Sequence, residues 1–173
     1  MYNNIMLASP NKVKQYATVG LNLDDSVLGN CIRLAQVHVK EVDTKDVFER
    51  VQELVNNKIQ ASGSSIDDNE NIAYKTLLDE CIVPAIAYGA AVEAATINEL
   101  KIRNAGTVKN SDTNVVTVGR DEYDHLASYY RTYLNDAFNR IADFLCENKA
   151  AFKELPDGYC TCSSKPRYAN CNL

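Results

Sequence analysis

The chain is poor in the residues from which most catalytic and cofactor sites are built. Among its 173 residues there is no tryptophan, and there are only two histidines and seven glycines. We find no glycine-rich phosphate loop, no paired-histidine metal motif and no nucleophile-elbow pattern. His38 falls near the end of a predicted helix, and a surface ion pair with Asp121 explains His125 more simply than a catalytic dyad does. The sequence therefore predicts no catalytic residues and no cofactor, and it predicts that the protein is not an enzyme.

Long apolar runs and an excess of basic residues are also lacking. The most apolar stretch, 81–92, is about 12 residues long, whereas a helix that crosses a bilayer needs about 20. The apolar segment 5–8 is too short for a signal peptide, and Pro10 follows it at once. The net charge of −5 excludes a basic footprint of the whole domain for nucleic acid. We therefore expect a protein that is made in a cytoplasm and makes no membrane contact.

What the sequence does contain is helical periodicity. Apolar residues recur at steps of three and four, the spacing of amphipathic helices. It predicts a short helix that starts at Ser9-Pro10, followed by helices over residues 25–40, 44–59 and 72–103. The second and third are joined by a short turn, which favours an antiparallel pair.

The predicted helix over 72–103 has two special features. One apolar register continues straight through Pro84, which favours a kink over a break. The residues after Pro84 are mostly alanine, with Gly89 among them. Small side chains let neighbouring backbones come close, so we expect this helix to lie buried among the others.

The last part of the domain combines a hairpin signal with a long helix. Two β-branched runs, 107–108 and 115–118, predict a β-hairpin arm over about 106–119. A lone two-stranded hairpin is marginal in water, so it needs support from the helices or from another subunit. The helix from 121 to about 149 would be about 43 Å long, which exceeds what one small domain can cover.

Together these patterns predict a fold of the mainly α class. The expected architecture is a helical bundle with a long C-terminal helix, a Pro-kinked central helix and an extended β-hairpin arm. A single helical domain would cover 1–158, and an extended, cysteine-rich tail would cover 159–173.

Candidate interface residues lie on the hairpin and on the long helix. The chain has ten tyrosines, and tyrosine offers a large contact area with one polar group. The residues that we expect at an interface with another subunit are Val108, Val115, Val116, Val118, Tyr129 and Tyr133.

The tail holds the only candidate metal ligands, Cys160, Cys162 and Cys171. Three thiolates could contribute to a zinc site, but zinc takes four ligands and no fourth lies nearby. We therefore interpret the tail as thiol-rich, expect no bound metal, and leave an intersubunit disulfide open. Without an export signal, reduced thiols are expected. The other three cysteines lie on predicted apolar faces and are expected to be small buried hydrophobic residues.

Several sequence stretches follow one another in a characteristic order. They are the short Ser9-Pro10 helix, LNLDD at 21–25, CIRLAQ at 31–36, NIAYKTLLDECIVP at 71–84, IRNAGTV at 102–108, and a long helix with YY at 129–130, YL at 133–134 and FLCEN at 144–148. In this order the chain resembles the head-to-tail connector subunits (neck or ring adaptors) of tailed bacteriophages, closest to those of crAss-like phages of Bacteroidetes. It departs from that pattern at 41–48, which lacks a leucine-glycine turn, and in the tail after Gly158.

The resemblance implies a structural virion protein at the neck, made in the cytoplasm of the host bacterium. Such subunits form a ring of roughly twelve copies, a homo-oligomer with heterologous interfaces, between the portal and the tail. The implied partners are further copies of the chain, the portal protein, and other neck or tail proteins. Packaged DNA would pass through the ring during genome ejection without sequence-specific binding. The alternative is a small helical regulatory or binding module that acts as a monomer or dimer.

Overall fold

The structure, a computed structural model, describes residues 5–17, 24–41, 45–104 and 120–159, and it describes their side chains outside 98–104 and 120–123. The described part of the chain is mainly helical. Its α-helices are α1 (Pro10–Tyr16), α2 (Asp25–Glu41), α3 (Lys45–Gln60), α4 (Ile72–Leu77), α5 (Val83–Asn104) and α6 (Arg120–Glu147). A π-turn at Leu78–Ile82 joins α4 to α5, and short 3₁₀ turns lie at Asn69–Asn71 and Lys149–Ala151.

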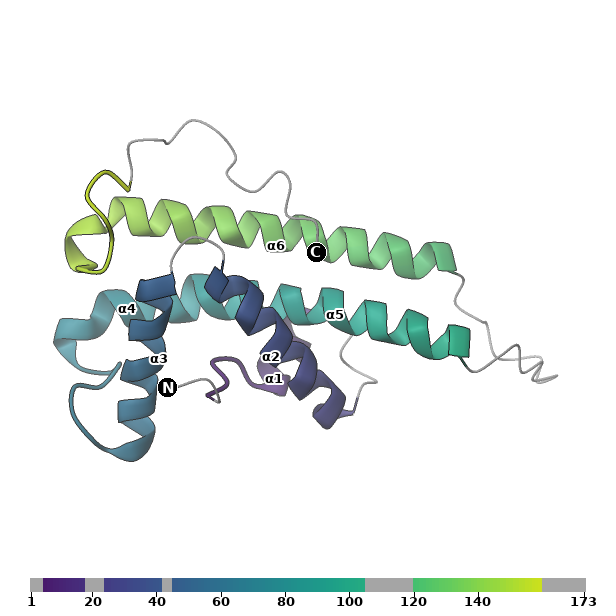
Figure 1. The fold of residues 1–173 in the computed structure, drawn as a ribbon, viewed down its shortest axis with the longest axis horizontal. Helices are drawn as coiled ribbons and strands as arrows, with labels where there is room; N and C mark the ends of the chain where they lie inside the picture. The colour runs from purple at the N-terminus through teal and green to yellow at the C-terminus, as the bar shows by residue number, and fades with distance from the viewer. Residues whose placement is uncertain (1–4, 18–23, 42–44, 105–119, 160–173) are drawn as a thin grey trace.

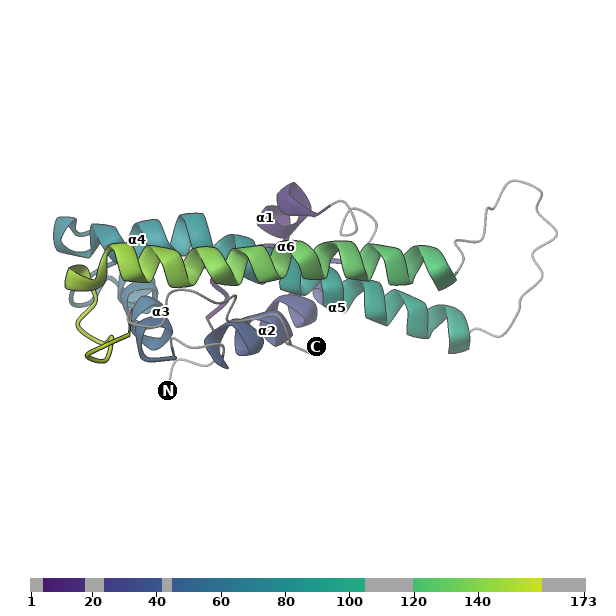
Figure 2. The same ribbon diagram turned by 90° about the horizontal axis from the view of Figure 1, so that it is seen from above.

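Helix α5 lies at the centre of the fold. It packs against α6 along its length and also contacts α2 and α1. Figure 2 shows α1 on one side of the α5–α6 pair and α2 and α3 on the other. In Figure 1 the α5–α6 pair also continues at one end beyond the helices that flank it. The molecule therefore has two distinct faces and a projecting pair of helices.

The predicted N-terminal helix forms as expected, and a buried side chain holds the segment before it. The Ser9 hydroxyl accepts a hydrogen bond from the backbone N–H of Lys12 at 3.3 Å, so Ser9 is the N-cap. Before it, the Gln36 amide from α2 accepts from the Leu7 N–H at 2.9 Å and donates to the Ile5 carbonyl at 2.8 Å. The Gln36 side chain therefore holds the segment before α1 against α2 through both its amide oxygen and its amide nitrogen.

The small residues of α5 permit the close packing that the sequence predicts. Ala85, Ala87, Ala90 and Ala94 are all fully buried. A Cβ added at Gly89 would lie 3.0 Å from the Cβ of Ala35, which is tighter than ordinary contact. The absence of a side chain at Gly89 therefore sets how closely α2 approaches α5.

Pro84 does not interrupt the central helix, which continues to Asn104. The wide π-turn ends at Ile82, two residues before the proline, and the Val83 N–H donates to the carbonyl of Leu78. Pro84 has no N–H to donate, so one carbonyl of the preceding turn lacks its usual partner. The π-turn is the local rearrangement that accompanies this loss.

The expected antiparallel pairing of α2 and α3 is not the main contact of α2. This helix packs chiefly against α5 and touches α3 only lightly. Its buried side chains, among them Leu28 and Ile32, fill the face next to the alanine-rich side of α5. The short turn between α2 and α3 led us to expect that these two helices pack on each other, but α2 buries more apolar surface by packing against the alanine-rich α5.

The predicted fold class is wrong in its β-hairpin arm. In the ranges that the structure describes there are helices and turns but no β-strand or hairpin. The segment to which we assigned the arm, 106–119, lies outside the described residues, as does the tail from 160 onwards. Short runs of β-branched residues express only a local preference, and a two-stranded hairpin needs packing partners to be stable. The described part of the fold is therefore built from helices and turns.

By length and composition, one described helical stretch could cross a membrane. It runs over Asn69–Ile97 and has a mean hydropathy of 1.3 in its most apolar window. It is longer than the apolar run 81–92 because it extends beyond that run at both ends. However, 72% of that window is buried inside the protein, as in the core helix of a globular domain.

Candidate functional site

Five tyrosines from three helices pack against one another on one side of the molecule. Tyr88 of α5 stacks on Tyr133 of α6, with ring centroids 5.3 Å apart, and meets Tyr16 of α1 edge-on at 5.9 Å. Tyr129 contacts both Tyr133, at 4.7 Å, and Tyr130, at 5.4 Å. We call these five residues the tyrosine cluster. The one-turn spacing of Tyr129 and Tyr133 along α6 brings their rings together.

Part of the tyrosine cluster faces solvent. Tyr129 is 54% exposed and Tyr133 38%, whereas Tyr130 is buried. The sequence predicted Tyr129 and Tyr133 as interface residues, and the structure places both on the surface. The Tyr129 hydroxyl donates to the Tyr133 hydroxyl at 3.1 Å, which raises the pKa of Tyr129. Burial raises the pKa of Tyr88. These phenols therefore stay protonated near neutral pH and offer uncharged aromatic surface.

An acidic groove of about 370 Å³ borders the tyrosine cluster. Its charged lining consists of Asp79 and Glu80 from the π-turn with Asp136 and Arg140 from α6. Three carboxylates thus face one guanidinium. Within the described residues none of the three carboxylates takes part in an ion pair. The groove lining therefore carries a net negative charge beside exposed aromatic rings.

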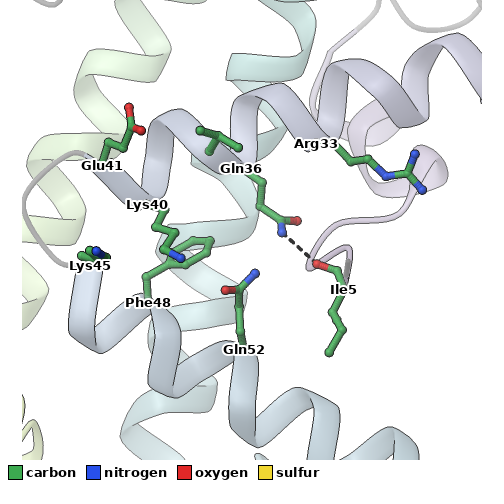
Figure 3. A pocket seen from close by; sticks show the side chains of 9 residues that line it. Ile5, Arg33, Gln36, Lys40, Glu41, Lys45, Phe48 and Gln52 are labelled. Atoms are coloured by element: carbon green, nitrogen blue, oxygen red, sulfur yellow. Dashed lines mark hydrogen bonds between the residues drawn. The ribbon is translucent and has the colours of Figure 1, made fainter. Parts of the chain in front are cut away.

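A basic pocket of about 480 Å³ lies between α2 and α3, on the opposite side of the α5–α6 pair (Figures 2 and 3). Arg33, Lys40 and Lys45 contribute positive charge to its lining, against the single carboxylate of Glu41. Lys40 also pairs at 2.9 Å with Glu49, and this hydrogen bond lowers the pKa of the Glu49 carboxyl. Even so, cations outnumber carboxylates in the lining.

Two buried glutamines form the inner wall of the basic pocket. Figure 3 shows Gln36 from α2 bonded to Ile5, and Gln52 from α3 with its amide directed into the pocket. Gln52 is only 4% exposed and has no hydrogen-bond partner among the residues that the structure describes. Its amide is not among the fully buried polar groups that lack a partner, so its polar atoms reach the open space of the pocket. The pocket therefore offers one polar group that is ready to bond.

The remaining reactive side chains do not assemble into a catalytic centre within the described residues. Cys31 and Cys81 are buried, as the sequence predicted, and Cys146 is half-buried. Burial raises the pKa of the Cys81 thiol to about 11, so it is a poor nucleophile near neutral pH. His38 lies 3.7 Å from Glu93, and His125 is exposed. The expected His125 partner, Asp121, is outside the described side chains.

Several predicted site residues are likewise outside the described part of the chain. These are the hairpin residues Val108, Val115, Val116 and Val118 and the tail residues Cys160, Cys162 and Cys171. Among the described residues no cluster of three or more histidine, cysteine, aspartate or glutamate side chains could hold a metal ion.

Sequence reasoning missed both charged hollows. Each is built by helices that are far apart in the chain, so no local motif announces it. The signal available for the acidic groove was the Asp79-Glu80 pair, four to five residues before Pro84, in a stretch whose other residues are mostly apolar. For the basic pocket, the signal was a buried position occupied by glutamine on each of two amphipathic helices.

Comparison with known proteins gives a family but no functional relative. No curated protein and no solved structure matches the chain. A family of unknown function, DUF6712, matches residues 39–165, which include α3 to α6 and most of the chain. The chain is therefore a member of the DUF6712 family.

Proposed function

We propose that this protein is a structural subunit of a tailed-phage virion, a ring-forming head-to-tail connector between portal and tail. The observation that carries the proposal is the tyrosine cluster, whose Tyr129 and Tyr133 leave aromatic surface uncovered on α6. Exposed aromatic patches are typical of surfaces that bind other proteins. Two further features support a role in assembly: the ordered sequence stretches that resemble connector subunits, and the α5–α6 pair that projects beyond the other helices (Figure 1).

The charge of the chain fits a subunit that lines part of the DNA exit channel. Its net charge is −5, and like charge keeps a phosphate backbone from binding to the wall. DNA would therefore slide past the ring during genome ejection without being held. The virion would be the place of action, after synthesis in the cytoplasm of the host bacterium.

The first experiment measures the particle mass of the purified protein by light scattering, alone and with a candidate portal protein. Negative-stain imaging of the same samples follows. Closed rings, formed alone or on the portal, are the expected result. Because α6 presents the tyrosines, Tyr129→Ser should weaken assembly, while Ile59→Ser should not. Ile59 is a matched control, since it is 68% exposed on α3 and lies outside the cluster.

A monomer or dimer that ignores the portal would overturn the connector proposal. It would favour the second candidate, a small helical regulatory or binding module. The same tyrosine variants would then be compared in pull-downs from cells that produce the protein. If Tyr129→Ser assembles as well as the unsubstituted chain, the tyrosine cluster does not mediate assembly.

A further inference from the structure

The two charged hollows lie on opposite faces of one chain and are opposite in sign. The acidic groove has three carboxylates and one guanidinium, and the basic pocket has three cations and one carboxylate. Figure 2 shows α1, whose Tyr16 borders the acidic groove, on one side of the α5–α6 pair, and α2 and α3, which build the basic pocket, on the other. Such a molecule is complementary to a translated or rotated copy of itself, face against opposite face.

We propose that the acidic groove of one copy docks against the basic pocket of the next, which joins copies head to tail through a heterologous interface. The occupant of each hollow is thus a second copy of this chain. The inference deepens the proposed function, on which it rests, because it names the two surfaces through which subunits of a ring would meet.

Apolar side chains border both hollows, as an interface core requires. Beside the acidic groove lie the exposed rings of Tyr16, Tyr129 and Tyr133. On the basic side, Val37 lines the pocket at 52% exposed, and Leu34, 47% exposed, lies one helical turn before it. Burying these side chains on association supplies a favourable free energy that charge pairing at the rim alone does not.

The amide of Gln52 adds a polar contact to this arrangement. Within the described residues it forms no hydrogen bond, and its amide points into the basic pocket, whose open space its polar atoms reach. A carboxylate of the neighbouring copy can accept from its N–H₂ group while pairing with the surrounding cations. The groove carboxylates Asp79 and Glu80 are both exposed, so both can reach a partner surface.

The test uses two charge-reversed forms of the full chain, each with one disabled face. The basic-face form carries Arg33→Glu and Lys45→Glu, and the acidic-face form carries Asp79→Lys and Glu80→Lys. All four side chains are exposed, so folding should be retained, which circular dichroism checks. Lys45 is the first residue of α3, where glutamate is favourable. Lys153→Glu and Asp157→Lys, exposed charges outside both hollows, are the matched controls.

Sedimentation velocity at low salt, over a wide range of concentration, is the measurement. We expect the unsubstituted chain and both controls to self-associate, and each reversed form to associate at least about tenfold more weakly. An equal mixture of the two reversed forms should associate again, beyond dimers, because the two substituted faces are opposite in charge to each other just as the two native faces are. Added salt should weaken all of these contacts.

Three results would overturn the inference. They are an unsubstituted chain that stays monomeric at every concentration, reversed forms that associate as well as the controls, and a mixture that forms no dimer. Binding to the portal separates this test from that of the proposed function. If the chain binds the portal but copies do not meet through the hollows, the connector proposal stands and the proposed interface between copies is wrong. If copies associate through the hollows but do not bind the portal, the interface stands and the portal-connector proposal is wrong.

Discussion

Replacing Gly89 by alanine should destabilise the protein, even though the same change normally stabilises a helix. Alanine in a helix interior is favoured over glycine by about 1 kcal/mol. At Gly89, however, the new Cβ would lie 3.0 Å from the Cβ of Ala35 and 3.8 Å from Cδ1 of Leu134. Overpacking of this kind costs about 1–3 kcal/mol. The net change in unfolding free energy should therefore lie between about zero and a loss of 2 kcal/mol.

Gly29 provides the matched control, because it also lies inside a helix. A Cβ added there would meet nothing within 4 Å. Gly29→Ala should therefore raise the unfolding free energy by about 0.5–1 kcal/mol through helix propensity alone. In a chain of this length, 1 kcal/mol corresponds to about 2–4 °C in the midpoint of thermal unfolding.

Urea unfolding followed by circular dichroism measures both changes. The difference between the two variants isolates the cost of the α2–α5 contact, expected at about 1–3 kcal/mol. Adding Ala35→Gly to Gly89→Ala removes the opposing methyl group, so the pair should be less destabilised than the sum of the two single changes. If Gly89→Ala stabilises the protein as much as Gly29→Ala does, the close approach of these helices does not constrain the fold.

Three further changes probe other parts of the structure. Gln36→Leu removes two part-buried hydrogen bonds and should lower the unfolding free energy by about 1–3 kcal/mol. Gln52→Leu removes no hydrogen bond among the described residues and is the control. If urea unfolding shows the same loss of unfolding free energy for both variants, the two hydrogen bonds of Gln36 do not stabilise the fold. Two lysines hold the pKa of Asp67 at about 2, below the ordinary 3.8, so it contributes stability above about pH 4 that is lost as pH falls towards 2. Asp67→Asn should therefore flatten the fall of the unfolding midpoint over that range, and an unchanged slope would count against it. The pKa of the Cys81 thiol is raised to about 11, so this thiol should react slowly with an alkylating reagent at pH 8 in the folded protein, which mass spectrometry measures. If Cys81 is alkylated as fast in the folded protein as in urea, it is not buried.

Helix positions could be predicted from the sequence because the apolar period is strong in each segment. The expected helix over 25–40 is observed as Asp25–Glu41, and the one over 44–59 as Lys45–Gln60. Ser9 followed by Pro10 correctly marked the start of α1. These features depend on neighbours three or four residues away, so the local sequence is sufficient to define them.

Contacts between segments that are far apart in the chain could not be predicted from the sequence in the same way. Nothing in the amphipathic pattern of α2 specifies that Ala35 meets Gly89 and not a residue of α3. Among the candidate site residues, Tyr129 and Tyr133 could be placed on a long helix, but the stacking of Tyr133 on Tyr88 joins two helices. The charged hollows depend on such long-range packing too, which is why they appear only in the structure.

The π-turn at Leu78–Ile82 links the core of this protein to its acidic groove. A π-turn takes up one residue more than an α-turn, so it shifts the face that each following residue occupies. Cys81 thereby lies buried, its Sγ 4.0 Å from the Arg140 carbonyl of α6, while Asp79 and Glu80 remain exposed beside the same helix. Pro84 follows two residues after this turn and cannot donate a backbone hydrogen bond, so the regular series of helical backbone hydrogen bonds is already interrupted at the wide turn. The π-turn itself contacts α6, so this turn is what holds the two carboxylates beside Asp136 and Arg140 in the acidic groove.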